Sequence, residues 1–528
     1  MLLNQSKIFL RVGKSHIKRK LSRWIEPHGE KTNINIYNCV AKKKVPLIVK
    51  NKHFITWYTC GPTVYSPAHI GHACTYIRLD TIQNILKRFF NYNIVSVVNI
   101  TDIDDKIIQR CTDSSLKEFT RRHENEFWDD MKQVGVQKPS IILRVTECIP
   151  QIINFIEKLI ETERAYVTRN SNVYFDLTKY ANYSKLQNIS SNMHITDLHE
   201  LDKRSTGDFA LWKGAKPSEP YWESPWGRGR PGWHIECSVL GTIAFGNSID
   251  IHAGGMDLRF PHHENEEAQS CCYHSVDQWV NYWIHTGSLN LPNSEKMSKS
   301  LGNTIRISDL LEKYTANEFR IACLISHYRD RIEFSADRMV TAKALYEKFL
   351  TFINFCDRFH KNSLLCTNED RHLLEFNLKH SYITIVKAFE DDFDTPKVFN
   401  TLMNMMSYTY TTLNKSQSKR QTDDLYRNVD IILAEKNFIL NILDVFGINL
   451  DVKYESNINL SRFEDIIDMC TEFRRDVRQV AIEKPVEPYQ ILFQLCDKLR
   501  GNLAKSGIQL RDEKDRIFEN RHCLFYLK

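Results

Sequence analysis

Two short strings combine side chains that could hold a chain of phosphates. The first is His69-Ile-Gly-His72, and the second, much later in the chain, is Lys296-Met-Ser-Lys-Ser300. Imidazoles at a helix start can donate hydrogen bonds to phosphate oxygens, and ammonium groups on a polar loop can stabilise charge on a departing phosphate. Each string alone is equally compatible with structural histidines or with a solvated basic loop. Together they indicate a nucleoside triphosphate site.

The elements that must position the first string follow a strand–helix–strand order. Residues 54–59 are a short apolar run rich in β-branched and aromatic side chains, and residues 94–100 have the same character. Between them, after a glycine–proline break, apolar residues recur at helical spacing over residues 71–90. This pattern predicts a βαβ unit with the first string at the N-terminus of its helix. The second string follows a further predicted strand, residues 282–291.

Four scattered residues could form a metal site. They are Cys60, which directly follows the first predicted strand, Cys237, His262 and Glu266. His262 and Glu266 are four positions apart, so they would share one face of a helix. Two thiolates, one imidazole and one carboxylate make a tetrahedral zinc set. Because the four residues are far apart in the sequence, they indicate a site built inside a cleft rather than a compact structural module.

The neighbours of these four residues are expected to have other roles. His263 would lie about 100° from its neighbour on a helix, so it is predicted to stay unligated. Glu236 and Glu264 are also not expected to be ligands, because their side chains would point in a different direction from those of the neighbouring ligands. A free cysteine is most often a small buried hydrophobe, and the adjacent cysteines 271 and 272 are predicted to pack in a helix.

Seven motifs in the same order resemble the cysteinyl-tRNA synthetases, a family of class I aminoacyl-tRNA synthetases. They are Cys60-Gly-Pro-Thr-Val-Tyr65, His69-Ile-Gly-His72, Asn99-Ile-Thr-Asp-Ile-Asp-Asp-Lys106, Pro231-Gly-Trp-His-Ile-Glu-Cys237, Ile251-His-Ala-Gly-Gly-Met-Asp-Leu258, Phe260-Pro-His-His-Glu-Asn-Glu266 and Lys296-Met-Ser-Lys-Ser300. The resemblance is strong from about residue 50 to 345 and weaker to about residue 515. It implies an α/β fold with a class I Rossmann-like catalytic domain, a connective insertion, an α-helical bundle and a small C-terminal module.

The resemblance also implies a reaction. ATP, with Mg²⁺ assisting, would activate L-cysteine to a cysteinyl-adenylate, and the terminal ribose of tRNA(Cys) would then accept the cysteine. In the family one Zn²⁺ per chain binds the substrate thiolate, and Cys60, Cys237, His262 and Glu266 match its ligands. A thiophilic metal separates cysteine from serine better than a steric pocket, which resolves small differences by only about 10–200-fold. Consistent with this, no large insertion that would hold an editing domain is evident.

Further site residues are implied by the family motifs. The catalytic residues that contact the triphosphate and the pyrophosphate would be His69, His72, Lys296 and Lys299. The residues that shape or border the cysteine pocket would be Gly61, Thr101 and Trp233. The segment that receives the adenosine would include Gly254, Gly255 and Asp257. Glycine there lets the backbone approach a flat ligand closely, although a Gly-Gly turn after a strand is compatible with the same residues.

Changes in composition suggest the domain boundaries, and the resemblance implies the tRNA-related roles of the domains. The expected ranges are a presequence at 1–30, the two halves of the catalytic domain at 31–150 and 231–304, the connective insertion at 151–230, a stem-contact linker at 305–345, a helical tRNA-binding bundle at 346–450 and a C-terminal anticodon-region module at 451–528. In the bundle, Phe349, Phe352 and Phe355 are predicted to be core rather than a base-stacking platform. Further on, Arg474, Arg475 and Arg478 fit either an anticodon contact or a solvated helix face.

Charge separates the N-terminus from the rest of the chain. Residues 1–50 hold twelve basic and two acidic side chains, whereas the whole chain of 528 residues has a net charge of +6. Residues 1–25 interleave basic and apolar residues without Asp or Glu, which is typical of a mitochondrial presequence, with a basic RNA-contacting arm as the alternative. Fourteen cysteines without a secretory signal indicate a reducing compartment. No apolar stretch is long enough to span a membrane, and we expect a monomer in the mitochondrial matrix.

Two other functions are compatible with part of this pattern. A related ligase that joins cysteine to an amino sugar would share the zinc and ATP motifs, but about 180 residues beyond Leu345 argue against it. An inactive RNA-binding scaffold would share the fold, but the intact phosphate-binding strings and metal ligands argue against that. We therefore expect an active synthetase that serves mitochondrial translation.

Overall fold

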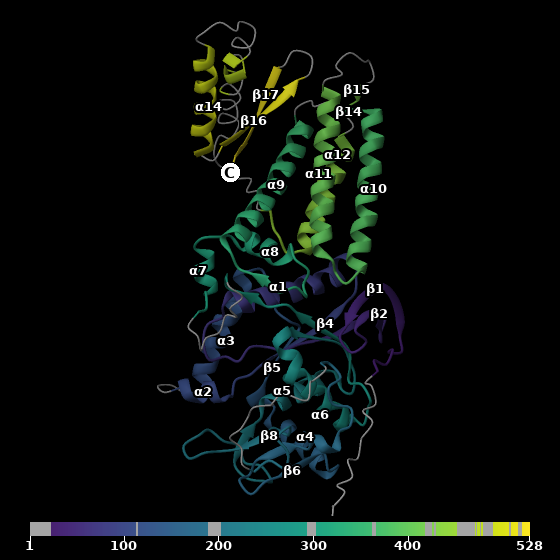
Figure 1. The fold of residues 1–528 in the computed structure, drawn as a ribbon, viewed down its shortest axis with the longest axis vertical. Coiled ribbons are helices and arrows are strands. Elements are labelled where there is room, and N and C mark those ends of the chain that lie inside the picture. The colour runs from purple at the N-terminus through teal and green to yellow at the C-terminus, as the bar shows by residue number, and fades with distance from the viewer. Residues whose placement is uncertain are drawn as a thin grey trace, which may run out of the picture.

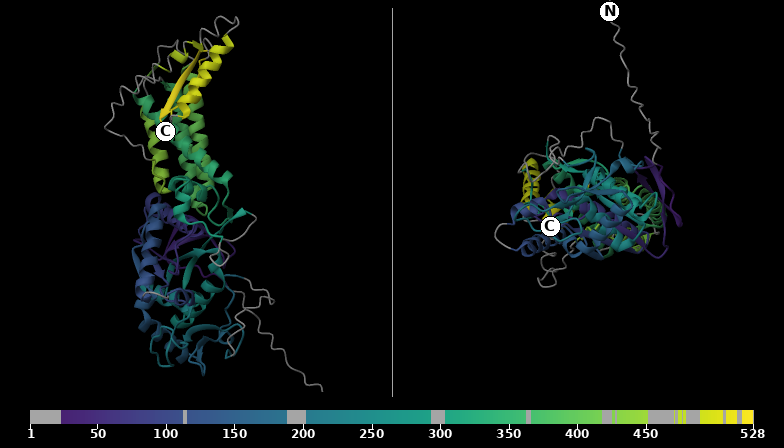
Figure 2. Two further views of the ribbon diagram at one scale, coloured as in Figure 1. Left: turned by 90° about the vertical axis from the view of Figure 1, so that its left-hand side faces the viewer. Right: turned by 90° about the horizontal axis from the view of Figure 1, so that it is seen from below.

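The structure is a computed structural model in which an α/β part and a helical part are stacked along the long axis (Figures 1 and 2). It describes residues 23–111, 115–187, 202–292, 303–361, 366–417, 425–426 and 429–450 and, towards the C-terminus, 470, 473–475, 477–478, 489–505, 508–515 and 520–527. None of the helices in these ranges is both long enough and apolar enough to cross a membrane.

The α/β part is built on a five-stranded parallel sheet with the order β11-β10-β3-β4-β5. Its strands are β3 (Ile55–Thr59), β4 (Ile94–Ile100), β5 (Ile141–Arg144), β10 (Ile249–Gly255) and β11 (Val280–Thr286). The chain adds strands first on one side of β3 and later on the other, so the strand order reverses between β3 and β10. Ligands bind at the carboxyl ends of strands where the order reverses in this way.

Helices cover both faces of this sheet because successive residues of a strand point to opposite faces. In β3, Trp57 joins one hydrophobic core and Tyr58 joins the other. The helices that pack on the Trp57 face are α1 (Ile70–Asn84), its π-helical continuation (Ile85–Phe89) and α3 (Leu116–Gln133). Those on the Tyr58 face are α5 (Trp233–Phe245) and α6 (Glu264–His274). The predicted βαβ unit is therefore confirmed, whereas the predicted strand 282–291 is divided into β11 and β12 (Leu289–Asn290).

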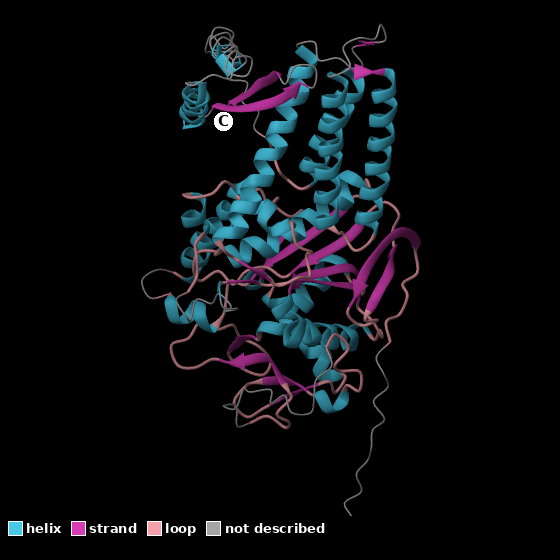
Figure 3. Ribbon diagram, turned by 45° about the horizontal axis from the view of Figure 1, so that its top comes forward, coloured by secondary structure: helices cyan, strands magenta, loops and turns pink. Residues whose placement is uncertain are grey.

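A small antiparallel sheet occupies the region where the connective insertion is expected (Figure 3). Its strands are β6 (Ala165–Val167), β7 (Val173–Phe175), β8 (Phe209–Gly214) and β9 (Gly229–Pro231), and α4 (Ile149–Glu161) precedes them. Asp105, at the start of α2 (Asp105–Arg110), forms ion pairs with Lys213 and with Arg230 and so ties this sheet to the catalytic domain. The hairpin of β1 (Glu30–Asn38) and β2 (Lys43–Val49) lies against β11, the edge strand of the five-stranded sheet.

A buried ion pair joins the catalytic domain to the helical part. Arg320 lies on α8 (Ala316–Leu324), which follows α7 (Ile307–Leu311) and precedes β13 (Ile332–Glu333). Its guanidinium lies 2.7 Å from the Asp80 carboxylate of α1 and donates to the carbonyl of Phe446 at 2.9 Å. Removing one member of such a pair would leave a buried charge without a partner.

Four long helices form the bundle of the helical part. They are α9 (Ala336–Lys361), α10 (Asn368–Glu390), α11 (Thr395–Gln417) and α12 (Val429–Val445), with the short pair β14 (Cys366–Thr367) and β15 (Leu425–Tyr426) at their far end. Phe349, Phe352 and Phe355 are buried between them, so their prediction as core is confirmed.

Beyond the bundle, the described elements are α14 (Tyr489–Lys505), β16 (Ile508–Asp515) and β17 (Asn520–Leu527). Arg474 is buried and donates to the carbonyl of Cys496, so a solvated helix face is wrong for this residue.

Candidate active site

The first string lies at the N-terminus of α1, where the sequence places it. His69 is the N-cap residue, and its Nδ1 accepts a hydrogen bond from the N–H of Gly71 at 3.1 Å. The Nδ1 of His72 accepts one from the N–H of His69 at 3.3 Å, and the two rings stack with centroids 3.8 Å apart. Because each Nδ1 accepts a hydrogen bond, the proton of each neutral ring lies on Nε2. Two ring donors and a helix start therefore meet at one place, which suits an anion.

The second string, with Lys296 and Lys299, lies outside the described residues. The chain that directly follows it pairs with the first string. The N–H of Ile70 donates to the carbonyl of Ile305 at 3.0 Å, and His69 forms a β-bridge with Arg306. The first string is thus held by the segment that comes immediately after the second one.

The four predicted metal ligands lie together at the carboxyl end of β3. Cys60 follows β3, Cys237 lies on α5, and His262 and Glu266 lie just before and within α6. One possible ligand atom of each residue lies within 4.8 Å of the other three, and all four residues are buried. The Cys60 and Cys237 Sγ atoms are 3.6 Å apart, and His262 Nε2 lies 3.0 Å from Glu266 Oε1. This donor set and spacing fit a tetrahedral zinc ion.

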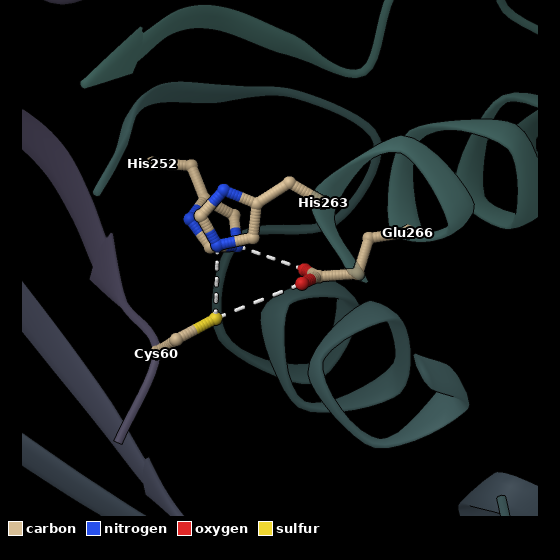
Figure 4. A group of neighbouring side chains, drawn as sticks. All are labelled: Cys60, His252, His263 and Glu266. Carbon is tan, nitrogen blue, oxygen red and sulfur yellow. Dashed lines mark hydrogen bonds and ion pairs between the residues drawn. The ribbon is translucent and has the colours of Figure 1, made fainter. Parts of the chain in front are cut away.

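A second set of possible ligands overlaps with the first. Cys60 and Glu266 also lie within 4.8 Å of His252 and His263 (Figure 4). The direction expected for His263 is wrong, because its Nε2 lies 3.3 Å from the Cys60 Sγ; that it stays unligated remains a prediction. His263 Nε2 lies beside the Cys60 Sγ while His262 Nε2 lies beside Glu266 Oε1, so the two neighbouring imidazoles join the same group through different partners. The expectation of a shared face for His262 and Glu266 is met.

Burial disfavours every charged form in this group. It raises the pKa of the Cys60 thiol and of the Glu266 carboxyl, and it raises the pKa of Cys237 to about 11. Burial likewise lowers the pKa of His262 well below its ordinary value. Thiolate and carboxylate become favourable here only when a cation balances them, which is what a bound dication does.

Three further histidines support the group, and the sequence reasoning did not name them. Their contacts are His252 Nε2 to Glu266 Oε2 at 2.8 Å, His285 Nε2 to His263 Nδ1 at 2.9 Å and His234 Nδ1 to His262 Nδ1 at 2.9 Å. His252 and His285 are buried in the central part of the fold, on β10 and β11. A histidine inside a buried strand is the signal that could have identified them. Glu236 and Glu264, which were set aside as ligands, have other partners: Glu236 accepts from Thr101, and Glu264 accepts three backbone N–H groups.

The predicted cysteine-pocket residues surround the four ligands. The N–H of Gly61 donates to Asn99 Oδ1 at 2.7 Å, and a Cβ at Gly61 would lie 1.5 Å from the Asn99 carbonyl oxygen, so only glycine fits. Thr101 Oγ1 donates to Glu236 at 2.7 Å. Trp233 stacks on the His262 ring with centroids 4.3 Å apart and remains 43% exposed. An apolar ring beside the ligands is thus open to an incoming molecule.

The predicted adenosine segment lies at the end of β10, beside β3. A Cβ at Gly254 would lie 2.9 Å from His263 Cε1, and one at Gly255 would lie 2.5 Å from Asp257 Oδ1. The need for glycine at position 254 therefore comes from the His263 ring inside the protein. Gly254, Gly255 and Asp257 still line the carboxyl edge of the sheet next to Cys60, whose N–H donates to the carbonyl of Ala253 at 3.2 Å.

Comparison with known proteins gives the family of this chain. The family model of the class I (C) tRNA synthetase catalytic domain matches residues 47–344. A probable mitochondrial cysteine–tRNA ligase of Xenopus tropicalis is 39% identical over 516 residues, which cover 93% of this chain and 90% of the relative. A cysteine–tRNA ligase of Methanococcus vannielii is 37% identical over 91% of this chain and 97% of the relative. The chain belongs to the cysteine–tRNA ligases.

The fold of this cysteine–tRNA ligase is also similar to solved structures of other class I aminoacyl-tRNA synthetases. Methionyl-tRNA synthetase of Mycobacterium tuberculosis, in complex with methionyl-adenylate, matches with a TM-score of 0.53 at 13% identity and covers 75% of this chain and 89% of that one. A putative arginyl-tRNA synthetase of Campylobacter jejuni matches with a TM-score of 0.52 at 13% identity, over 76% of this chain and 93% of that one. At such identities the likeness concerns the fold, and the class I Rossmann-like fold predicted from the sequence is confirmed.

Proposed function

We propose that this protein attaches L-cysteine to tRNA(Cys) through a cysteinyl-adenylate, with release of pyrophosphate and then AMP. The observation that carries the proposal is the buried group Cys60, Cys237, His262 and Glu266 at the sheet edge where strand order reverses. One member of the group, Cys60, lies on the loop that leads to the His69 helix start, nine positions before His69. A site for a sulfur-containing amino acid and a site for phosphates thus share one edge of the sheet.

Zinc fits the four ligands on the chemistry of this structure. Two sulfurs, one imidazole nitrogen and one carboxylate oxygen converge within 4.8 Å, and burial disfavours their charged forms without a cation. Bound there, zinc would lower the pKa of a cysteine thiol and would bind the serine hydroxyl poorly. Gly61, Thr101 and Trp233 would enclose the rest of the amino acid. The neutral His262 ring, stacked on Trp233, is suited to ligation.

Charge stabilisation by this chain accounts for the activation step. The Nε2–H groups of His69 and His72, at the start of α1, would donate to the phosphates of ATP, which carries Mg²⁺. Lys296 and Lys299 would stabilise the pyrophosphate as it leaves. Gly254, Gly255 and Asp257 would receive the adenosine. Neither step requires a nucleophile from the protein, because the substrate carboxylate attacks the α-phosphorus and the tRNA ribose attacks the adenylate.

The remaining domains would bind the tRNA. The insertion at 151–230, tied to the catalytic domain by the Asp105 ion pairs, would receive the acceptor end. The linker at 305–345, the bundle at 346–450 and the module at 451–528 would follow the stem towards the anticodon. The elongated arrangement of the two parts supports this division.

We place the enzyme in the mitochondrial matrix, in the service of mitochondrial translation. The basic, apolar N-terminal segment at 1–30 supports an import signal. A second relative named as mitochondrial, from Dictyostelium discoideum, is 36% identical over 96% of this chain. A cytoplasmic ligase from the same organism is also 36% identical, over 94% of this chain, so the N-terminal segment is the observation that carries this assignment.

The test of the proposed function is charging of mitochondrial tRNA with labelled cysteine by the zinc-loaded protein. We expect acid-stable label on tRNA that requires ATP and is absent from a control in which His69 and His72 are both alanine. Cysteine-dependent pyrophosphate exchange without any label on tRNA would instead favour the ligase that uses an amino sugar.

A further inference from the structure

A loop of the insertion, residues 183–187, is bound to the start of α6, beside two of the proposed metal ligands. In this anchor loop the hydroxyl of Tyr183 donates to Asn265 Oδ1, and Lys185 Nζ lies 3.1 Å from the Glu267 carboxylate. Asn265 and Glu267 belong to the first turn of α6. The insertion is therefore attached to the catalytic domain at the turn where this helix begins.

The centre of the contact is the buried carboxylate of Glu264. Its Oε1 accepts the N–H groups of Ser184 and Lys185, and its Oε2 accepts the N–H of Leu186, each at 2.8 Å. Successive backbone N–H groups that converge in this way form a nest, which binds an anion.

The backbone of Ser184 is suited to this nest, and its side chain is not needed for it. Ser184 has φ 78°, a left-handed conformation that is unfavourable for residues other than glycine and persists where surrounding contacts hold it. Its hydroxyl oxygen is buried and has no hydrogen-bond partner among the described residues. The position therefore contributes through its N–H group rather than through its hydroxyl.

Glu264 lies midway between two proposed metal ligands, two positions after His262 and two positions before Glu266. Within the described chain no side chain caps the N-terminus of α6, so contacts with other elements fix the place of its first turn. The side chains of the two ligands are oriented by His234 and by His252. The nest around Glu264 instead holds the backbone from which both ligands extend.

We propose that Glu264 is a positioning residue for the metal ligands, held in place by the backbone nest of the anchor loop. Both of its carboxylate oxygens are taken up by the nest, so it acts on the metal through the backbone of α6. This role rests on the proposed zinc site, and it makes the geometry of that site depend on a loop that begins about 80 positions earlier in the chain. Zinc affinity should therefore respond to changes in the anchor loop that alter no ligand.

A pair of substitutions at Ser184 tests the nest without a change at any ligand. Ser184→Pro removes the N–H group and cannot adopt a positive φ, whereas Ser184→Gly keeps the N–H group and adopts this conformation readily. Competition with a fluorescent chelator measures the zinc affinity of the purified full-length proteins. We expect Ser184→Pro to weaken zinc binding about 10–100-fold, the loss typical when a contact that orients metal ligands is removed, and Ser184→Gly to bind zinc as the parent does.

Glu264→Gln tests the same contact from the other side, because an amide has one acceptor oxygen where the carboxylate has two. We expect a loss of zinc affinity of similar size. The matched control is Asp208→Asn, since Asp208 is a buried carboxylate of the insertion that accepts the N–H groups of Leu177 and Ser205. This variant should lower the Tm as Glu264→Gln does but leave the zinc affinity unchanged, which separates a loss of stability from a loss of ligand geometry.

Cobalt in place of zinc gives a second readout, because the visible absorption of bound Co²⁺ depends on the geometry of its ligands. We expect the spectra of Ser184→Pro and Glu264→Gln to differ from the spectrum that the parent shares with Asp208→Asn. Zinc affinity equal to that of the parent in both Ser184→Pro and Glu264→Gln would overturn the positioning role and leave the zinc site intact. Equal losses in Ser184→Pro and Ser184→Gly would also overturn it, whereas a parent protein that binds no zinc would overturn the metal assignment and this role together.

Discussion

His252 and Glu266 form a fully buried pair, with His252 Nε2 2.8 Å from Glu266 Oε2. The other carboxylate oxygen, Oε1, lies 3.0 Å from His262 Nε2 and 3.6 Å from the Cys60 Sγ. One carboxylate therefore contacts both possible ligand sets, and the imidazole from strand β10 fixes its rotation about the last side-chain bond. Residues that orient a ligand in this way usually matter nearly as much as the ligand itself.

We therefore predict that His252→Ala weakens zinc binding about 10–100-fold, since Glu266 loses the partner that orients it. Competition with a fluorescent chelator measures the zinc affinity. His53→Ala, on an exposed loop residue, is the control and should bind zinc as the parent does. Unchanged zinc affinity in His252→Ala would show that Glu266 is oriented without this histidine.

The two overlapping ligand sets make different predictions for Cys237 and His263. If Cys60, Cys237, His262 and Glu266 bind the metal, Cys237→Ser should lose most of the bound zinc, because a hydroxyl is a poor ligand, while His263→Gln should retain it. Metal analysis after dialysis against a weak chelator distinguishes the variants. The reverse outcome, zinc retained in Cys237→Ser and lost in His263→Gln, would assign the metal to the set that contains His252.

The two ligand sets show which residues of the site could be predicted from the sequence and which could not. The four-residue spacing of His262 and Glu266 correctly places both on one side of α6, and the motif order finds Cys60 and Cys237 although they lie on different elements. The predicted direction of His263 was wrong because helical spacing gives only the angle between neighbouring residues, whereas contact with Cys60 depends on where strand β3 ends relative to α6. His252 and His285 were missed because their positions depend on which strands are neighbours in the sheet, and that is set by tertiary packing.

For the second string we predict a selective effect on catalysis. Lys299→Ala should lower the rate of cysteine-dependent ATP–pyrophosphate exchange about 10²–10³-fold at saturating substrates, because it removes charge stabilisation that matters mainly in the transition state. Cysteine binding in the absence of ATP should change little. Lys313→Ala, on an exposed lysine after α7, is the matched control. Equal losses in binding and in rate would contradict a transition-state role.

The buried carboxyl of Glu435 makes the free energy of unfolding of the bundle depend on pH. Burial raises the pKa of this carboxyl from 4.5 to about 8, and its Oε2 accepts a hydrogen bond from Thr409 at 2.7 Å. Between these two pH values the unfolded chain has lost the proton while the folded bundle keeps it, so the free energy of unfolding falls as pH rises from 4.5 towards 8. Above pH 8 the loss is complete and constant.

Glu435→Gln removes this titration, so we predict that the variant gains stability relative to the parent on going from pH 5 to pH 8, by a few kcal/mol at most. Urea unfolding of both proteins at pH 5, 6.5 and 8 measures the difference. Glu375→Gln, on an exposed residue of α10, serves as the control and should show no such trend. A constant difference between Glu435→Gln and the parent at all three pH values would mean that this carboxyl is ionised in the folded bundle.

The bundle also shows which buried residues the spacing of apolar residues in the sequence can predict and which it cannot. Helical spacing identified the Phe349, Phe352 and Phe355 core, since a repeated large apolar side chain on one face must be buried. It did not separate the exposed face of α10 from the buried one, because Leu373 and Leu374 are the same residue type and only the packing of α11 and α12 decides which is covered. Similarly, Arg474 resembles any surface arginine until its neighbour Cys496 is placed.

The most direct test of the central claim, that metal ligation of the thiol selects the amino acid, is ATP–pyrophosphate exchange by the zinc-loaded protein with cysteine and with serine in parallel. We predict one zinc per chain and a ratio of kcat/KM for cysteine over serine well above the about 200-fold that a steric pocket can provide. We also predict that this preference disappears together with activity when zinc is removed. A ratio within the steric range, or an undiminished preference in the zinc-free protein, would contradict the account.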